Sequence, residues 1–583
     1  MTDTVKIKIN GMEYDVAKGS TILQAARSVG IDIPTLCYLK DINAIGACRI
    51  CVVEVKGART LVASCVFPVN EGMEIFTNTP AVQKSRRMTL ELILSNHRMD
   101  CLTCERNQNC ELQALSKRYG VEDVRFGSEE EVPAQIEDKT AYLVRDNSKC
   151  ILCRRCVAVC KENQHVAVIG PNDRGFETHI SCAFDKDLGD VPCIACGQCI
   201  NICPTGALTE KDNTQAVWDA INDPNKHVVI ATAPSVRAGL GEEFGYAIGE
   251  NVEPKMVAAL RRMGFDKVFD VDTAADLTIL EEGTELLDRI QNNGVLPLIT
   301  SCSPGWIKFC EHFYPEFIPN ISSCKSPQQM YGAMMKTYYA EKEGIDPKDL
   351  FVVSVMPCTA KKFEITREDQ SAAGVPDIDV SITSRELAKM IKEAGIMFDQ
   401  LPDEEFDPAF GIASGAAHIF GATGGVMEAA LRTVYEIVTG EPLTDLNLHD
   451  VRGIEGVKEA EYDLKGTKVR VAVASGGENA SRLLEKIKSG EAPDYHFIEI
   501  MACPGGCVNG GGQPIQPASV RNNMDLRAER AKALYGEDEE MTLRKSHENP
   551  LIKKLYDEYL EKPGSHKAHD ILHTTYKARP KYK

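Results

Sequence analysis

The chain lacks the features that would direct it to a membrane or to nucleic acid. It contains no uninterrupted apolar run of transmembrane length, and its first residues show neither a secretion signal nor a twin-arginine pair. Its net charge of −19 disfavours binding to phosphate backbones and to anionic lipid, because both require a positive surface. These absences predict a cytoplasmic protein that binds no nucleic acid.

Nucleotide-binding signatures are missing as well. The sequence shows no glycine-rich dinucleotide fingerprint and no flavin site. The glycines at 510–512 lack the lysine and the strand–loop–helix context of a phosphate loop, so we expect them to permit close backbone approach instead. If the chain exchanges electrons with NAD(P)H, another subunit must bind the nucleotide.

Cysteine, in contrast, is abundant, with 22 cysteines in 583 residues. Because the cytoplasm keeps thiols reduced, clustered cysteines in such a chain predict metal sites rather than disulfides. The length is sufficient for several domains. We therefore divide the chain by its cysteine clusters.

Residues 1–78 carry the first cluster. Alternating apolar residues at 5–9 predict a strand, and the whole segment is expected to form a β-grasp ferredoxin-like domain. Three cysteines in one loop and a fourth further on are typical of plant-type ferredoxins, although the spacing here is wider. A [2Fe–2S] centre is the prediction and a zinc site the alternative; the ligands are Cys37, Cys48, Cys51 and Cys65.

Residues 79–118 carry a histidine followed by three cysteines. This set can close a zinc site or hold a [4Fe–4S] cluster with one imidazole ligand. The spacing resembles the histidine-ligated cluster of the large peripheral subunit of complex I and of iron-only hydrogenases. The resemblance implies a small [4Fe–4S] domain with the ligands His97, Cys101, Cys104 and Cys110.

Residues 140–210 contain an internal repeat. The spacing C-x2-C-x2-C-x3-C occurs twice and predicts an α+β bacterial ferredoxin with two [4Fe–4S] clusters. In that arrangement the fourth cysteine of each run binds the other cluster. One set is then Cys150, Cys153, Cys156 and Cys203, and the other is Cys193, Cys196, Cys199 and Cys160.

Residues 225–520 change in character. Continuous apolar runs at 227–231, 351–356 and 469–475 alternate with amphipathic helical stretches, which predicts an α/β domain with parallel-sheet lobes. Active sites of such folds lie at the carboxyl ends of the strands, so residues 233–235, 300–303, 356–358 and 499–503 are expected to converge. The segment 521–583 is polar, basic and helical, and we expect it to wrap the domain without a chemical role.

Several co-linear motifs in this domain resemble those of the iron-only ([FeFe]) hydrogenases. They are residues 233–235, 275–285, 300–306, 322–329 and 414–425, together with the motifs around Cys358 and Cys503–Cys507. The resemblance covers nearly the full chain and implies the reaction 2H⁺ + 2e⁻ ⇌ H₂. It implies an H-cluster, in which a [4Fe–4S] cubane shares one cysteine with a diiron unit carrying CO and CN⁻. The segment 521–583 resembles the small subunit of periplasmic relatives.

The resemblance also assigns ligands. Cys507 matches the bridging cysteine, and Cys358 and Cys503 match two further cubane ligands. The first loop of the family usually has two adjacent cysteines, one a proton relay and the next a ligand, whereas this chain has Cys302 followed by Ser303. Either Cys302 binds the cubane after a small loop shift, or Ser303 does and Cys302 carries protons.

Further residues receive roles from the same resemblance. The proton relay is implied to run from Cys302 through Glu282, Ser322 and Glu285, with Arg289 as an additional member. Lys361 matches the residue beside one cyanide, and Ala233 and Ser235 match positions beside the other. The remaining pocket positions are Pro327, Gln328, Met356, Phe420 and Met501, whereas Cys310 and Cys324 are interpreted as structural thiols.

The predicted function is therefore the catalytic subunit of a cytoplasmic, modular hydrogenase. The N-terminal domains resemble subunits of NAD(P)-linked, flavin-containing complexes, which implies such partners in a hetero-oligomer, with ferredoxin as a further one. Two alternatives compete: a hydrogen-sensing or low-activity relative, which the Cys302–Ser303 departure favours, and a non-catalytic electron-transfer subunit. The second alternative would not need Lys361 or the relay carboxylates.

Overall fold

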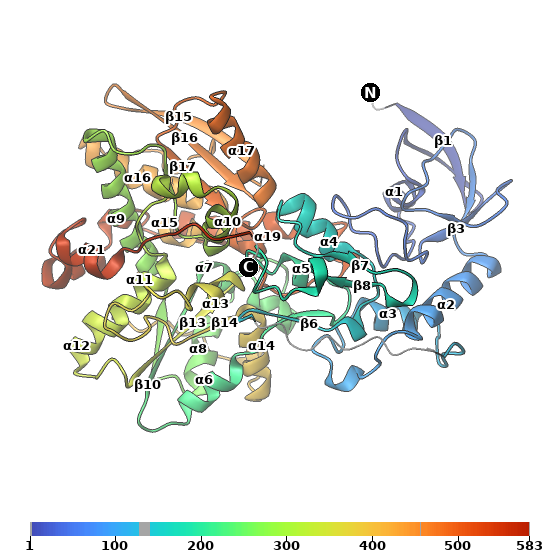
Figure 1. Cartoon of the computed structure of the whole chain (residues 1–583), viewed down its shortest axis with the longest axis horizontal. Helices are drawn as coiled ribbons and strands as arrows, with labels where there is room; N and C mark the ends of the chain where they lie inside the picture. Colours follow the sequence, from blue (N-terminus) through green and yellow to red (C-terminus); the bar gives the residue numbers. More distant parts are fainter. Residues whose placement is uncertain (1–2, 128–139, 455, 582–583) are drawn as a thin grey trace.

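Small modules rich in cysteine extend from a larger α/β body (Figure 1). The computed structural model describes residues 3–127, 140–454 and 456–581. Within these ranges, no helix combines the length and the apolarity needed to cross a membrane. The modules follow one another along the chain, and the last of them lies against the body (Figure 1).

The first module is a five-stranded mixed sheet, as expected for a β-grasp domain. Its strand order is β2-β1-β5-β3-β4, with β1 antiparallel to β2 and parallel to β5. Residues of β1 alternate between exposed and buried, which places its apolar side on the core. The strands are β1 (Thr4–Ile9), β2 (Met12–Ala17), β3 (Val52–Val55), β4 (Val62–Ala63) and β5 (Glu74–Phe76), and α1 (Ile22–Ser28) begins at a Thr21–Gln24 capping box.

Two further modules connect this sheet to the body. The second consists of α2 (Pro80–Leu94) and α3 (Glu111–Arg118), which enclose the segment with His97 and the three cysteines. The third is a compact ferredoxin unit, in which β6 pairs with β9 and β7 pairs with β8. Its elements are β6 (Leu143–Arg145), α4 (Arg155–Ala158), β7 (Gly170–Asn172), β8 (His179–Ser181), α5 (Gln198–Asn201) and β9 (Leu208–Glu210).

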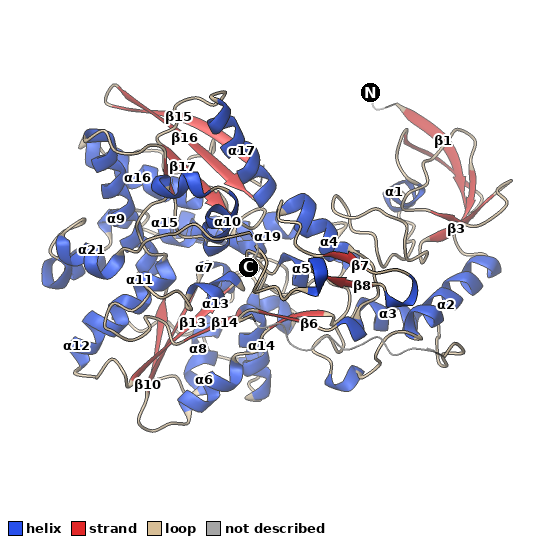
Figure 2. Ribbon diagram, in the orientation of Figure 1, coloured by secondary structure: helices blue, strands red, loops and turns tan. Residues whose placement is uncertain are grey.

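The body contains two four-stranded sheets surrounded by helices (Figure 2). The first is entirely parallel, with the order β11-β10-β13-β14, and its strands are almost continuously buried, as the apolar runs predicted. Its strands are β10 (His227–Thr232), β11 (Lys267–Asp270), β13 (Leu350–Met356) and β14 (Val380–Thr383).

The second sheet departs in one respect from the parallel lobes that the sequence predicts. In the order β12-β17-β16-β15, the strands β12 (Leu298–Ile299), β17 (Phe497–Met501) and β16 (Thr467–Ser475) are parallel, but β15 (Val457–Leu464) is antiparallel to β16. The edge strand β15 alternates buried and exposed residues, because one of its faces is solvated. It therefore has no continuous apolar run by which the sequence would reveal it.

Helix α9 (Asp272–Gln291) packs against α11 (Pro327–Met334) and α16 (Gly425–Thr439). The C-terminal segment is helical, as predicted, and follows the body: α19 (Leu526–Glu540) packs on α15 (Gly415–His418), α20 (Pro550–Leu555) on α9, and α21 (His566–Leu572) on α11. The remaining α-helices are α6 (Thr214–Ile221), α7 (Pro234–Arg237), α8 (Glu253–Met263), α10 (Pro304–Phe313), α12 (Ala340–Glu343), α13 (Ala360–Glu364), α14 (Ser384–Glu393), α17 (Gly477–Ser489) and α18 (Ala518–Arg521).

Candidate active site and electron path

A buried pocket lies where strands of both sheets end. Strand β10 leads into Ala233, β13 ends at Met356, β17 ends at Met501, and Cys302 lies between β12 and α10. The convergence follows from parallel strands, whose carboxyl ends share one edge. Of the residues predicted for the site, the pocket is lined by Ala233, Cys302, Pro327, Gln328, Met356, Cys358, Lys361, Phe420, Met501 and Cys507.

Three thiols at this pocket form a donor set suited to an iron–sulfur cubane. The Cys503 thiol contacts that of Cys358, and this contact lowers the pKa of Cys358. Cys507 lines the pocket and lies close to Cys358, and burial together with Cys358 raises the pKa of Cys507 to about 12. Metal binding would deprotonate such thiols, so the residues present fit a cluster that connects to the pocket through Cys507.

Cys302 and Ser303 have different surroundings. Cys302 lines the pocket, and its backbone oxygen accepts a hydrogen bond from Lys361 Nζ at 3.2 Å. The Ser303 hydroxyl accepts a hydrogen bond from the backbone N–H of Ala502 at 3.2 Å, directly before Cys503 in the chain. The thiol thus borders the pocket, whereas the hydroxyl lies next to the segment that carries the cubane cysteines.

The Lys361 ammonium is buried but well paired. Its Nζ donates to Ser326 Oγ and to Glu364 Oε2, each at 2.9 Å. Gln328 donates to the same Glu364 oxygen at 2.9 Å, so one carboxylate orients two of the predicted pocket residues. The geometry presents a fixed positive charge and amide dipole at the pocket wall, which is suited to a ligand with partial negative charge.

Ser235, which is predicted to lie beside the diiron unit, directly follows the lining residues Ala233 and Pro234. Its backbone oxygen accepts a hydrogen bond from Gln513 Nε2 at 2.7 Å, and its hydroxyl lies 3.5 Å from the backbone oxygen of Gly421. Ala233 and Gly421 form the wall at this point. Ser235 thus adjoins the wall at Gly421, and its predicted place beside a cyanide stays a prediction.

A series of buried polar groups leads from Cys302 toward the surface along α9. Glu282 is fully buried, and burial followed by the charge of Glu285 raises its pKa to about 8. Both Glu282 carboxyl oxygens are buried without a hydrogen-bond partner among the described residues, although Ser322 lies close enough to affect the pKa. Ser322 Oγ donates to Glu285 Oε2 at 2.8 Å, and Arg289 contacts the other Glu285 oxygen at 2.6 Å.

The sequence analysis missed a buried charge network behind the pocket. Asp272 lines the pocket wall, and burial together with Asp270 raises its pKa to about 8. Arg237 donates to Asp270 at 2.8 Å and to Asp272 at 3.1 Å, and His418 Nδ1 lies 2.6 Å from Asp272. These residues come from three separate segments, around 237, 270–272 and 418, so local patterns in the sequence do not group them.

The eight ferredoxin cysteines line one cavity, and their mutual effects on pKa group them into two sets. Besides burial, the pKa of Cys156 is raised by the nearby thiols of Cys153, Cys150 and Cys203. Cys199 also raises it, but by a smaller amount. The thiols that act most strongly on Cys199 are Cys196, Cys193 and Cys160. The last cysteine of each run thus lies with the other run, as an arrangement of two cubanes requires.

The N-terminal cysteine sets also fit clusters. In the first module the thiols of Cys37 and Cys48 contact each other, as do those of Cys51 and Cys65. In the second module, Nδ1 of His97 is buried without a hydrogen-bond partner among the described residues, and burial lowers the pKa of His97. A neutral imidazole with an unpaired nitrogen is what metal ligation needs.

Hydrogen bonds connect these sets to one another. Asn43 Nδ2 donates to the backbone oxygens of Cys37 and Cys153 at 2.9 and 3.0 Å, so the first module meets the ferredoxin unit. Arg106, between Cys104 and Cys110, donates to the backbone oxygen of Cys203 at 3.1 Å. Both N-terminal sets therefore approach the same set, that of Cys150, Cys153, Cys156 and Cys203.

The other ferredoxin set approaches the pocket. A Cβ added at Gly511 would lie 2.2 Å from the backbone oxygen of Cys196, so only glycine permits this backbone contact. The thiol of Cys196 lies close enough to Cys358 and Cys503 for their charges to affect one another. Gly511 thus permits the ferredoxin unit to approach the segment that follows Cys507.

Models of known protein families match successive parts of the chain. The family model "Iron only hydrogenase large subunit, C-terminal domain" matches residues 226–511, and "Iron hydrogenase small subunit" matches residues 524–579. Residues 2–80 match a 2Fe-2S iron-sulfur cluster binding domain. Residues 86–125 match the NADH-ubiquinone oxidoreductase-G iron-sulfur binding region, and residues 141–209 the ferredoxin-like domain of NADH-quinone oxidoreductase subunit 3.

Full-length relatives share this organisation. The chain is 49% identical to the NADP-reducing hydrogenase subunit HndD of Solidesulfovibrio fructosivorans, with 98% of each chain covered. It is 45% identical to iron hydrogenase 1 of Clostridium pasteurianum, over 98% of this chain and 99% of that one. A solved apo [FeFe]-hydrogenase of Chlamydomonas reinhardtii is 45% identical and covers 63% of this chain and 99% of its own, with a TM-score of 0.56.

Proposed function

The chain belongs to the iron-only hydrogenases, and from this premise we propose that it is the H₂-converting subunit of a cytoplasmic complex that exchanges electrons with NAD(P)H. A flavin-containing partner subunit would bind the nucleotide, with ferredoxin as a further electron partner. The proposal rests on the continuous series of cysteine sets between the first module and the pocket. It is supported by the relative whose name describes an NADP-reducing hydrogenase subunit.

We propose one [2Fe–2S] cluster, three accessory [4Fe–4S] clusters and an H-cluster for this series. The shared contacts of Asn43 and Arg106 with the first ferredoxin set favour two branches through which electrons enter. Both branches would join at that set and continue through the set that contains Cys196. The net charge of −19 would attract a partner protein that carries a basic patch, and this attraction would raise the rate at which the partner binds the chain.

At the pocket, an H-cluster held by Cys507, Cys358 and Cys503 would supply the two-electron chemistry of H₂ at its diiron unit. Lys361, Gln328 and Met356 shape and polarise the wall around that unit. Lys361 is fixed by Glu364 and Ser326, so its charge needs no rearrangement during turnover.

The chain's own residues carry the proton. Cys302 borders the pocket and lies beside Glu282, whose negative charge contributes to raising the pKa of the Cys302 thiol. From Glu282 the path continues to Ser322 and Glu285, and Arg289 holds the Glu285 carboxylate near the surface. Burial excludes bulk water from Cys302 and Glu282, so protons reach the pocket along this path.

We assign the proton-carrying role to Cys302 and the fourth cubane position to Ser303. Replacing Cys302 by Ser is expected to lower H₂ evolution by about 10²-fold or more, because a hydroxyl is a much weaker acid than a thiol. The electron paramagnetic resonance (EPR) signal of the reduced terminal cubane should persist in this variant. Replacing Ser303 by Cys should instead alter that signal, since it changes a ligand atom. Loss of the cubane signal in Cys302→Ser would reverse the two roles.

The electron partner can be tested on the complex itself. The chain, tagged and purified anaerobically from its native cells, is expected to bring down a flavin-containing subunit, and the assembly should reduce NAD(P)⁺ with H₂. The chain matured alone should evolve H₂ from reduced viologen but leave NAD(P)⁺ unchanged, because it has no recognisable nucleotide fingerprint. NAD(P)⁺ reduction by the isolated chain would contradict the proposed partner.

The alternatives make different predictions in the same assay. A hydrogen sensor would show the infrared bands of CO and CN⁻ with little H₂ evolution. An electron-transfer scaffold would show neither the bands nor the activity after co-expression with hydrogenase maturation proteins.

A further inference from the structure

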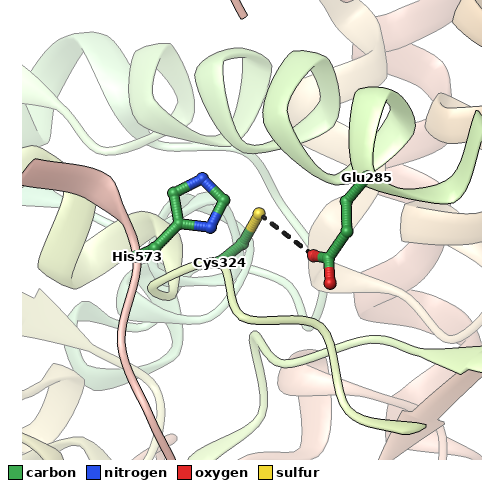
Figure 3. A group of neighbouring side chains, drawn as sticks. All are labelled: Glu285, Cys324 and His573. Carbon is green, nitrogen blue, oxygen red and sulfur yellow. Dashed lines mark hydrogen bonds between the residues drawn. The ribbon is translucent and has the colours of Figure 1, made fainter. Parts of the chain in front are cut away.

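Three side chains of types that bind metals, Glu285, Cys324 and His573, lie together near the outer end of the proposed proton path. The thiol of Cys324 is situated between the carboxylate of Glu285 on α9 and the imidazole of His573, which follows α21 (Figure 3). One donor atom from each of the three residues lies within 4.8 Å of the other two. Thiolate, imidazole and carboxylate are the ligand types of zinc sites in proteins.

Contacts with neighbouring residues fix the position of each donor. Glu285 directs Oε1 to Arg289 at 2.6 Å, while Oε2 lies 3.9 Å from Cys324 Sγ. His573 contacts Ser323 Oγ through Nδ1 at 2.8 Å and Glu281 through Nε2 at 3.2 Å. Whichever nitrogen binds a metal, the other retains a partner that fixes the ring, as is usual for histidine ligands.

The group is buried and surrounded by acidic residues, yet it can be reached from solvent. Cys324 is fully buried, whereas the side chain of Glu285 is 15% exposed. Burial, followed by the charges of Glu285 and Glu282, raises the pKa of the Cys324 thiol well above its usual range. The same negative potential that disfavours a thiolate favours a divalent cation.

Other clusters of potential ligands among the described residues differ from this one. Asp270, Asp272 and His418 already surround the guanidinium of Arg237. Glu436 in the cluster with His547 and Glu548 is paired with Lys545. The group of Asp173, His179 and Asp185 is largely exposed and contains no thiol. Glu285 also has a cationic partner, Arg289, so ion pairing does not separate these groups; the Glu285 group is distinguished by its buried thiol in a mixed donor set.

We propose that Glu285, Cys324 and His573 form a binding site for zinc or a similar thiophilic divalent cation. Binding would replace the proton of the Cys324 thiol by the metal and release that proton to solvent, with no change of oxidation state. Zinc prefers four ligands in a tetrahedral arrangement, so three protein donors leave a position for a water molecule. The donor atoms lie within 4.8 Å of one another, so they would have to move only slightly to bind one ion. His573, directly after α21, and Cys324, in a loop, can make this movement.

Occupation of this site would inhibit the enzyme, a consequence that rests on the proton path proposed above. Glu285 Oε2 is also the acceptor of the Ser322 hydroxyl at 2.8 Å. A cation bound to that oxygen lowers its proton affinity and adds positive charge to the path. Protons would then be hindered between Ser322 and the surface, while the clusters and the pocket remain intact.

The test uses the matured, cluster-loaded chain with one equivalent of Zn²⁺. Zinc-edge X-ray absorption is expected to show one Zn–S contact at about 2.3 Å. H₂ evolution from reduced viologen should fall at least tenfold, since a proton-transfer group contributes about 10²–10⁴-fold. A chelator should restore the activity.

Two variants and a control make the test specific. Cys324→Ala should keep its H₂ evolution without zinc, lose the Zn–S contact and resist inhibition. His573→Gln should weaken zinc binding while retaining the Zn–S contact at high zinc. Cys310→Ala removes another buried thiol, which contacts the backbone oxygen of Tyr314 at 3.2 Å outside the group, and should behave as the unmodified chain.

The outcomes separate the site from the proton path. A Zn–S contact or zinc inhibition that persists in Cys324→Ala would overturn the site, because zinc would then be held elsewhere. A Zn–S contact that depends on Cys324 without any inhibition would support the site and overturn the role of Glu285 in the relay.

Discussion

Replacing Glu282 by Gln is expected to reduce H₂ evolution by about two to four orders of magnitude. Glu282 is the carboxyl group between Cys302 and Ser322, and glutamine keeps its size but cannot exchange a proton at useful rates. The iron content, the EPR signals and the infrared bands of CO and CN⁻ should be unchanged, which would separate loss of proton transfer from loss of a cluster. H₂ can be measured by gas chromatography with reduced viologen in excess.

Asp288→Asn is a matched control for this substitution. It neutralises a carboxylate on the same helix α9, which accepts a hydrogen bond from Asn292 Nδ2 at 2.7 Å and takes no part in the proposed relay. The control should retain the activity of the unmodified chain. An unchanged rate in Glu282→Gln, with the control also active, would remove Glu282 from the relay.

The pH profile provides an independent view of Glu282. Because burial and Glu285 raise its pKa to about 8, the carboxyl group holds a proton at neutral pH and loses it as the pH rises through about 8. Proton delivery to the pocket should therefore decline above about pH 8. The raised pKa also links folding to pH, because the folded protein holds the Glu282 proton more tightly than the unfolded chain does. The stability that this proton contributes is present at low pH and is lost as the pH rises toward about 8. Both effects should disappear in Glu282→Gln.

Replacing Cys507 by Ala is expected to abolish H₂ turnover. Cys507 both lines the pocket and lies beside Cys358, so its thiolate is placed to join the cubane to the diiron unit. Loss of that ligand should remove the CO and CN⁻ bands, whereas the EPR signals of the accessory clusters should persist. Cys310→Ala serves again as the control for a buried thiol.

Turnover retained by Cys507→Ala would contradict the assignment of the whole site. A protein that loses all clusters together would point instead to a folding defect. Circular dichroism and iron content distinguish that result from the specific loss expected here.

The cysteine spacings alone predicted most of the modular organisation. The repeat at 150–160 and 193–203 predicts that the first three cysteines of each run share a cluster, because a short loop limits how far they can separate. The apolar runs likewise predicted the buried parallel strands, since a strand covered on both faces carries apolar residues throughout. The domain boundaries at 78, 118, 140, 210, 225 and 520 stay predictions.

Sequence patterns were less informative where contacts are distant along the chain. The edge strand β15 was missed because half of its residues face solvent. The network of Arg237, Asp270, Asp272 and His418 joins segments up to 181 residues apart, and no local pattern relates them. Ser235 contacts Gly421 and Gln513, which lie 186 and 278 residues further along the chain, and no local pattern predicts these contacts.

The sequence by itself determined the chemistry that this chain carries: thiols at cluster spacing, carboxylates on one helix, and motifs that identify the iron-only hydrogenases. Only the tertiary structure decided how Cys302 and Ser303 are divided between the pocket and the cubane segment, because adjacent residues can face different neighbours. It also brought His573, from a C-terminal segment expected to have no chemical role, to Cys324 and Glu285. Such contacts depend on packing between elements hundreds of residues apart, so the spacing of residues along the chain does not predict them.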